Sequence, residues 1–238
     1  MGDLTGDGQM DIASGKWIYK NPGEQMAAKW ARHEIGDSLD ALLIMNVDND
    51  EKGDLIAAKC NRQYWIEVMG LDQDQLIIHQ IGSLPVCNHG TSTQGYNQAQ
   101  IIPGGRQEIL LNAEGVHCLI IPDDPGSGEW PSLTLLESGS NGEWVSSGDM
   151  DGDGDQDVCL FLTSSMESDP GMNRVCWLEN PGNLEEQWKT HVIGQTNHHG
   201  DKVIPADVNG DGRLDLVVTE ERWPGLDKDA GMYWFEAP

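Results

Sequence analysis

The chain has 238 residues, enough to bury one hydrophobic core, and a formal net charge of −26 at neutral pH. A surface this acidic repels nucleic acid and anionic membranes, so we expect neither as a partner. No apolar run reaches the roughly 18 residues of a membrane-spanning helix, which argues against membrane insertion. At least fourteen of the forty acidic residues lie in four short loops, so ligation of cations accounts for part of the charge.

The most acidic of these loops spans residues 149–157, with carboxylates at alternate positions and a glycine directly after the third. This pattern suits Ca²⁺, which takes roughly six to eight oxygen ligands from a tightly curled loop. An EF-hand loop would need a Glu in its twelfth position, which is Leu160 here. The apolar run Val158–Leu162 predicts a buried strand instead, so the loop joins two strands.

The same pattern returns in residues 3–11 and 207–215, and in a looser form in residues 46–54. Glu51 replaces the glycine in the looser copy, so we expect a more strained turn and weaker binding there. We predict that all four loops bind Ca²⁺. The expected ligands are Asp3, Thr5, Asp7, Asp11, Asn46, Asp48, Asp50, Asp54, Asp149, Asp151, Asp153, Asp155, Asp157, Asp207, Asn209, Asp211 and Asp215.

A strand, a turn and a second strand follow these loops, which indicates an internal repeat. The turn is Asn-Pro-Gly at residues 21–23 and 180–182, and the second strand contains Trp-x-x-His-x-Ile-Gly at residues 30–36 and 188–194. The long gap between the second and third loops holds two units, one with a Pro103–Arg106 turn in place of a metal loop. Short antiparallel strands at this spacing predict one all-β domain over 1–238, a β-propeller of about five four-stranded blades. The expected blades are 1–36, 37–82, 83–137, 138–194 and 195–238.

The loops and the two motifs resemble the FG-GAP or VCBS repeats of calcium-binding β-propellers over nearly the whole chain. The resemblance implies that each metal loop joins the first two strands of a blade and that rings commonly have seven blades. No strand precedes Asp3, and the last unit lacks its fourth strand, so we expect an incomplete part of a seven-bladed ring in a longer chain. A compact five-bladed ring is the alternative. Calcium loops imply an extracellular or cell-surface location, although no signal peptide precedes them.

The five cysteines leave at least one thiol without a partner in the chain. Cys159 and Cys176 lie in successive expected strands and could be bridged, or all five could be small buried apolar residues. Other residues recur with the repeat, and we expect these to be structural rather than functional. They are His33, His79, His191, Trp17, Trp65, Trp177 and Trp234.

Residues that break the repeat are the candidates for ligand binding, in loops expected opposite the metal loops. A binding module would recognise glycans or proteins through Tyr64, Tyr96, Trp223 and Arg174. The alternative is a polysaccharide lyase for uronic-acid polymers, which the stretch from Pro103 to Gly115 weakly resembles. β-Elimination needs a base and a cation that neutralises the uronate carboxylate. Those roles would fall to His89, His198 or His199 with Arg62 or Arg222. We favour binding over catalysis, with ordinary loop residues as the third interpretation.

Overall fold

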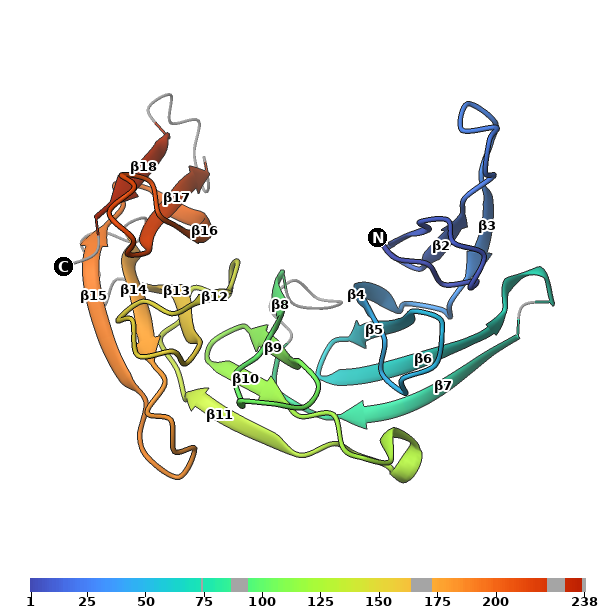
Figure 1. The fold of residues 1–238 in the computed structure, drawn as a ribbon, viewed down its shortest axis with the longest axis horizontal. Coiled ribbons are helices and arrows are strands. Elements are labelled where there is room, and N and C mark those ends of the chain that lie inside the picture. The colour runs from blue at the N-terminus through green and yellow to red at the C-terminus, as the bar shows by residue number, and fades with distance from the viewer. Residues whose placement is uncertain (74, 87–93, 164–172, 222–229, 237–238) are drawn as a thin grey trace. The chain divides into compact units, whose positions relative to one another are not determined.

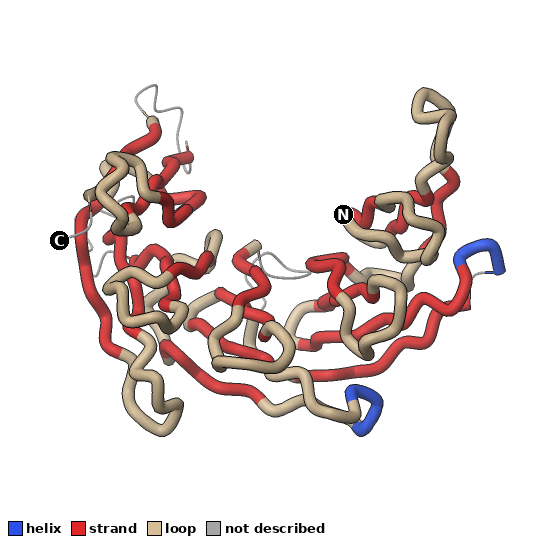
Figure 2. Tube along the Cα trace, in the orientation of Figure 1, coloured by secondary structure: helices blue, strands red, loops and turns tan. Residues whose placement is uncertain are grey.

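A computed structural model describes residues 1–73, 75–86, 94–163, 173–221 and 230–236. These residues form an all-β structure in which five antiparallel sheets contain all the named strands. Helical structure in the described part is confined to two single turns, η1 (Leu71–Gln73) and η2 (Pro125–Ser127) (Figures 1 and 2). No helix among the described residues is long and apolar enough to cross a membrane. The predicted all-β class is confirmed.

Each sheet takes consecutive strands in sequence order, because short connections between neighbouring strands favour antiparallel pairing. Sheet I contains β1 (Ile12–Ser14), β2 (Trp17–Lys20) and β3 (Ala31–Glu34), and sheet II contains β4 (Asp40–Met45), β5 (Asp54–Lys59), β6 (Arg62–Gly70) and β7 (Gln75–Gly82). Sheet III contains β8 (Gly95–Ala99), β9 (Glu108–Asn112), β10 (Val116–Leu119) and β11 (Ser132–Leu136). Sheet IV contains β12 (Ser146–Gly148), β13 (Asp157–Thr163), β14 (Asn173–Glu179) and β15 (Lys189–Gln195), and sheet V contains β16 (His199–Ala206), β17 (Asp215–Glu221) and β18 (Met232–Phe235).

Sheets I and V have three strands, and the other three sheets have four. Ahead of sheet I, Gly2 makes a single antiparallel bridge with Asp11. The first strand of sheet III ends at Ala99, before the apolar pair Ile101 and Ile102. The reason is that the backbone N–H groups of Ile101 and Ile102 donate to the Glu108 carboxylate, at 2.8 and 3.1 Å, instead of to a neighbouring strand.

The chain divides into two compact units, Met1–Ser92 with Ile120–Pro131, and Thr93–Leu119 with Ser132–Pro238. In the first unit, apolar residues of sheets I and II and of the loops beside them form one core that includes Leu4, Ile18 and Leu55, all fully buried. The second unit has two cores, one on each face of sheet IV. The side chains of β13 alternate between them, because successive residues of a strand point to opposite faces.

This alternation determines whether Cys159 and Cys176 can form a disulfide. Cys159 pairs across the strands with Trp177, whereas Cys176 pairs with Leu160, so the two thiols lie on opposite faces of sheet IV. The proposed bridge between them is therefore wrong, and Cys118, Cys159 and Cys176 are free and buried. Cys60 is disulfide-bonded.

The recurring histidines do have structural roles in sheets II and IV. The His79 ring stacks on Trp65 with centroids 4.5 Å apart, and the His191 ring stacks on Trp177 at 4.1 Å. The expected equivalence of Trp17 is wrong, because Ile18 occupies the position opposite His33. Trp234 also differs from Trp65 and Trp177, because it is 47% exposed on β18 at the edge of sheet V.

Candidate functional site

Three aspartates converge in the loop between β12 and β13. Asp149, Asp151 and Asp153 each place a carboxylate oxygen within 4.8 Å of the other two. The two oxygens of Asp149 accept N–H groups from Gly152 at 2.7 Å and Gly154 at 3.1 Å, which curls the loop around this side chain. Both glycines have positive φ, 80° and 100°, a conformation that costs other residues energy.

The donor set of this loop fits a hard divalent cation. All three groups are carboxylates, the ligand type that Ca²⁺ prefers. Burial is the main cause of a raised Asp151 pKa, and the Asp153 and Asp149 carboxylates add a smaller repulsion. A divalent cation between the three side chains would offset that repulsion.

The last aspartate of each loop makes bracing contacts. Asp157 is buried and accepts backbone N–H groups from Met150 and Asn180, both at 2.8 Å. Asp11 accepts the equivalent groups from Leu4 at 3.0 Å and Asn21 at 2.8 Å. Each therefore ties its loop to the Asn-Pro-Gly turn that follows. Burial raises the pKa of Asp157 to about 6.

The first aspartate of the loops at residues 3–11 and 207–215 makes the same hydrogen bonds to glycine N–H groups that Asp149 makes. Asp3 accepts N–H groups from Gly6 and Gly8 at 2.7 and 2.8 Å, and Asp207 accepts those of two glycines in the same positions. In the second of these loops the Arg213 guanidinium lies 2.8 Å from Asp211. That contact holds the pKa of the Asp211 carboxyl below its usual range.

The loop at residues 46–54 differs because it begins with an amide. Asn46 accepts the N–H of Asn49 at 2.7 Å, but its NH₂ group occupies the place of a second oxygen and donates to the Asp50 carbonyl at 2.6 Å. Asn49 has a φ of 64°, whereas Glu51 does not adopt a positive φ. The left-handed residue of this turn that is not glycine is therefore Asn49, and not Glu51 as expected.

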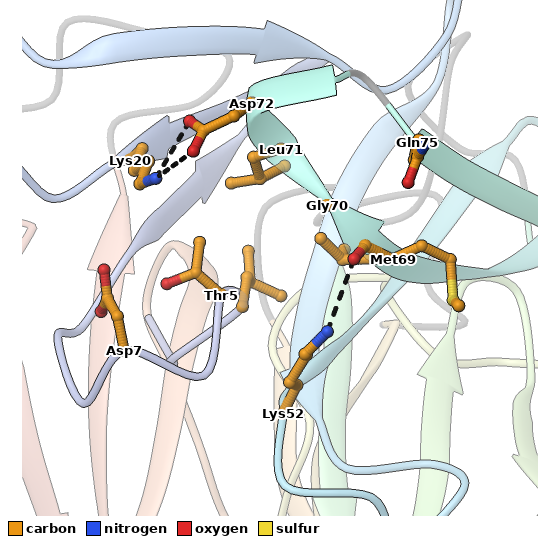
Figure 3. A pocket seen from close by; sticks show the side chains of 11 residues that line it. Thr5, Asp7, Lys20, Lys52, Met69, Gly70, Leu71, Asp72 and Gln75 are labelled. Carbon is orange, nitrogen blue, oxygen red and sulfur yellow. Dashed lines mark hydrogen bonds and ion pairs between the residues drawn. The ribbon is translucent and has the colours of Figure 1, made fainter.

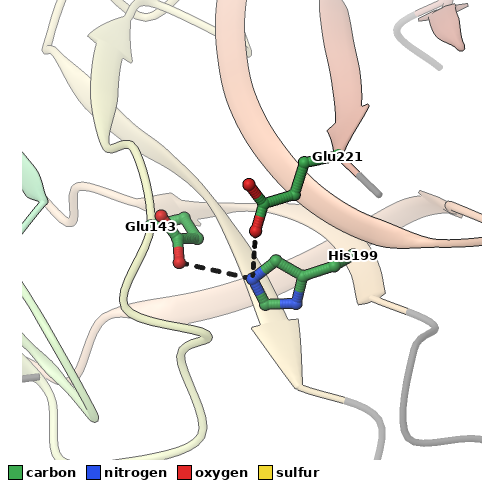
Figure 4. Close-up of side chains that lie close together, drawn as sticks. All are labelled: Glu143, His199 and Glu221. Atoms are coloured by element: carbon green, nitrogen blue, oxygen red, sulfur yellow. Dashed lines mark hydrogen bonds and ion pairs between the residues drawn. The ribbon is translucent and has the colours of Figure 1, made fainter. Parts of the chain in front are cut away.

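A second cluster joins His199, Glu143 and Glu221 within the second unit (Figure 4). The His199 Nε2 atom lies 3.3 Å from Glu143 Oε1 and 3.9 Å from Glu221 Oε1. The contact with Glu143 is the main cause of a raised His199 pKa. Because this contact already engages the Nε2 atom, the geometry does not favour His199 as the free base that the lyase role requires.

The other predicted residues are dispersed. Arg62 is exposed on β6 and Tyr64 packs beside the core of sheet II, both in the first unit. In the second unit, Arg174 is exposed on β14, and the backbone N–H of His198 donates to Glu220 at 3.0 Å. The Tyr96 ring lies 6.4 Å from that of Trp144. Three further candidates, His89, Arg222 and Trp223, lie outside the described residues.

Two residues of interest were missed by sequence reasoning. Glu143 is buried beside a histidine that follows it by 56 positions, so nothing local indicates the contact. Trp144 contacts both Tyr96 and Lys202, whose Nζ lies 5.1 Å from the ring centroid. Both lie in an Asn-Gly-Glu-Trp segment with no counterpart in the repeat, and that departure is the only signal that could have found them.

A cavity of about 270 Å³ lies in the first unit, beside the loop at residues 3–11 (Figure 3). Thr5, Asp7 and Lys20 line one side. Lys20 pairs with Asp72 at 3.0 Å, and Lys52 contacts the Met69 carbonyl at 3.5 Å. Because both lysines are engaged, the cavity lining does not point to an anionic ligand.

Comparison with known proteins identifies part of the repeat. Residues 149–218, which include the three converging aspartates, match the family described as FG-GAP-like repeat. No curated protein matches the chain. A solved structure of an Agrocybe aegerita lectin, described as specifically recognising non-reducing terminal N-acetylglucosamine, matches at 14% identity with a TM-score of 0.58. The match covers 99% of this chain and 62% of the lectin chain, and identity this low shows the fold alone.

Proposed function

We propose that this chain, which carries an FG-GAP-like repeat, is a calcium-braced binding module of the β-propeller type that recognises carbohydrate. The observation that carries the proposal is the convergence of Asp149, Asp151 and Asp153 inside the matched repeat. Five successive antiparallel sheets, three of them complete four-stranded meanders, support the propeller assignment. The chain spans about 62% of the length of the lectin it matches, consistent with part of a larger ring.

Carbohydrate is the ligand class that the second unit supports. The solved structure that shares the fold is a lectin, and Tyr96 and Trp144 form an aromatic pair close to the polar side chain of Lys202. Aromatic rings beside a few polar groups are the usual lining of small-ligand sites. We therefore place the glycan contact at this pair.

Binding of glycans that end in N-acetylglucosamine tests the proposal. Titration calorimetry with the calcium-loaded chain should show saturable binding, and Tyr96→Ala should weaken it at least tenfold because one ring of the pair is removed. Tyr233→Ala is the matched control, since Tyr233 also has a neighbouring ring at 6.4 Å, that of Phe235. Equal loss in both variants would contradict the placement. Absence of binding across a wider glycan array would contradict the carbohydrate class.

The calcium proposal predicts a ranking of the loops. Asp153→Ala removes one of three converging carboxylates, whereas Asp50→Ala changes a loop whose first position is an amide. In saturating calcium, Asp153→Ala should cost more stability, by about 1–2 kcal/mol, since at a given calcium concentration the tighter site adds more to the free energy of unfolding. Urea denaturation of both variants measures the difference. A larger loss in Asp50→Ala would show that the looser loop is the stronger site.

An extracellular or cell-surface location is part of the proposal. Ca²⁺ is abundant there, and the disulfide at Cys60 is typical of oxidising compartments. The partners would then be glycans or glycoproteins, together with the rest of a longer parent chain. The lyase alternative is the weaker candidate, since the His199 imidazole is already engaged by the Glu143 carboxylate at 3.3 Å.

A further inference from the structure

Glu143, His199 and Glu221 come from three separate segments of the second unit. Glu143 lies in the turn before β12, His199 begins β16, and Glu221 ends β17, where it is the cross-strand partner of His199. The side chains are 7%, 19% and 44% exposed, so the group is buried at one end and open at the other. All three present one donor atom within 4.8 Å of the other two (Figure 4).

We propose that these three side chains bind a divalent transition-metal ion of the zinc type, at a site separate from the calcium loops. One imidazole nitrogen with two carboxylate oxygens suits zinc, whereas calcium takes oxygen ligands alone. At metal–ligand distances of about 2.0–2.2 Å, two donors of a tetrahedral ion stand roughly 3.3–3.6 Å apart. The separation of 3.3 Å between His199 Nε2 and Glu143 lies at the lower end of that range, and the separation of 3.9 Å from Glu221 lies slightly above it. Glu221 is the most exposed of the three, so its side chain can move closer.

The backbone around the cluster is fixed in advance. The Asn141 side chain accepts the N–H of Glu143 at 3.0 Å and donates to the carbonyl of Gly200 at 2.8 Å. It thus links the turn that carries Glu143 to the strand that carries His199. Asn112 Nδ2 donates to the Glu143 carbonyl at 2.7 Å, and a Cβ at Gly95 would lie only 2.1 Å from the same oxygen. Outer contacts of this kind hold ligands in place before an ion binds.

The competing explanation is a structural ion pair, and the same unit offers a matched control for it. His191 contacts Glu179 and stacks on Trp177, so it too is a histidine beside a carboxylate. Among the described residues, however, His191 belongs to no group of three converging donors. A structural pair predicts similar behaviour of His191 and His199 toward metal, and a metal site predicts different behaviour.

Titration calorimetry of the whole chain with ZnCl₂, in saturating CaCl₂ to keep the loops filled, tests the proposal. We expect one more bound zinc in the wild type and in His191→Gln than in His199→Gln or Glu143→Gln. With CoCl₂ as the probe, a visible absorption band should appear in the wild type and be lost in His199→Gln. Asn141→Ala, which changes only a positioning residue, should weaken zinc binding by about 10–100-fold at unchanged stoichiometry.

Equal zinc stoichiometry in the wild type and His199→Gln would overturn the site, as would loss of zinc in His191→Gln or failure of the wild type to bind it. If circular dichroism shows that His199→Gln is unfolded, Glu221→Gln replaces it, since that side chain is more exposed. It should weaken zinc binding at least tenfold, and an unchanged affinity would contradict the proposal. The outcome is independent of carbohydrate binding, which uses a different probe and a different variant.

Discussion

Chelation of calcium with EDTA should lower the melting temperature of this chain by roughly 5–11 °C for each filled loop. One site occupied at 100 times its Kd adds about 2.7 kcal/mol to the free energy of unfolding, because the unfolded chain cannot gather the ligands. A chain of this size loses about 2–4 °C per kcal/mol. Emptying the loop at 149–157 also leaves Asp149, Asp151 and Asp153 close together without a neutralising ion.

Differential scanning calorimetry in millimolar CaCl₂ and in EDTA measures this change. Readdition of CaCl₂ should restore the original melting temperature, whereas MgCl₂ should restore less of it, because Mg²⁺ demands near-ideal octahedral geometry and gives up its waters reluctantly. Matching melting curves with and without the chelator would contradict the calcium proposal but not the fold of five antiparallel sheets.

Much of the fold could be predicted because its signals are local and repeated. The glycine-containing aspartate loops and the Asn-Pro-Gly turns mark where strands begin and end, and the strands do alternate with them. The errors concern register. Trp17 lies one residue from the position opposite His33, and Cys159 lies one residue from the face that holds Cys176. A shift of one residue reverses the face of a strand, and composition alone does not reveal it.

The aspartate cluster could be predicted from the sequence, whereas the cluster of Glu143, His199 and Glu221 could not. Asp149, Asp151 and Asp153 are close in sequence, so their spacing predicts their convergence. Glu143 and His199 are brought together only by the packing of a turn against a strand, which the Asn141 contacts hold. Neither residue recurs in the other units at an equivalent position, so no internal comparison could have paired them.

Glu108 was not recognised from the sequence, because sheet III lacks a metal loop. In the structure Glu108 is buried at the start of β9, and one of its oxygens accepts the N–H groups of Ile101 and Ile102. Asp157 braces its own loop through Met150 in the same way. Sheet III thus retains the bracing carboxylate of the repeat without the metal ligands, which indicates that the brace does not depend on an ion.

Glu108→Ala should therefore destabilise the chain by about 2–4 kcal/mol in saturating calcium. It leaves two backbone N–H groups without an acceptor, one of them on the fully buried Ile101, and each buried unsatisfied group costs about 1–3 kcal/mol. Glu108→Gln should cost far less, because both N–H groups bond to a single oxygen that the amide retains. Urea denaturation of the two variants and the wild type measures the comparison. Equal losses in both variants would show that the charge, and not the acceptor, matters.

The difference in stability between Glu108→Gln and the wild type should change with pH in a defined direction. Burial raises the pKa of Glu108 above its usual value of 4.5, so the folded state holds this proton more tightly than the unfolded state does. The contribution of Glu108 to stability is then fully present below pH 4.5 and is lost as pH rises through the folded pKa. Glu108→Gln lacks this titration. Its stability relative to the wild type should increase as pH rises above 4.5 and then level off, since the other titrating groups cancel in the difference. A relative stability that falls over this range would mean that the charged carboxylate is the favoured form in the fold.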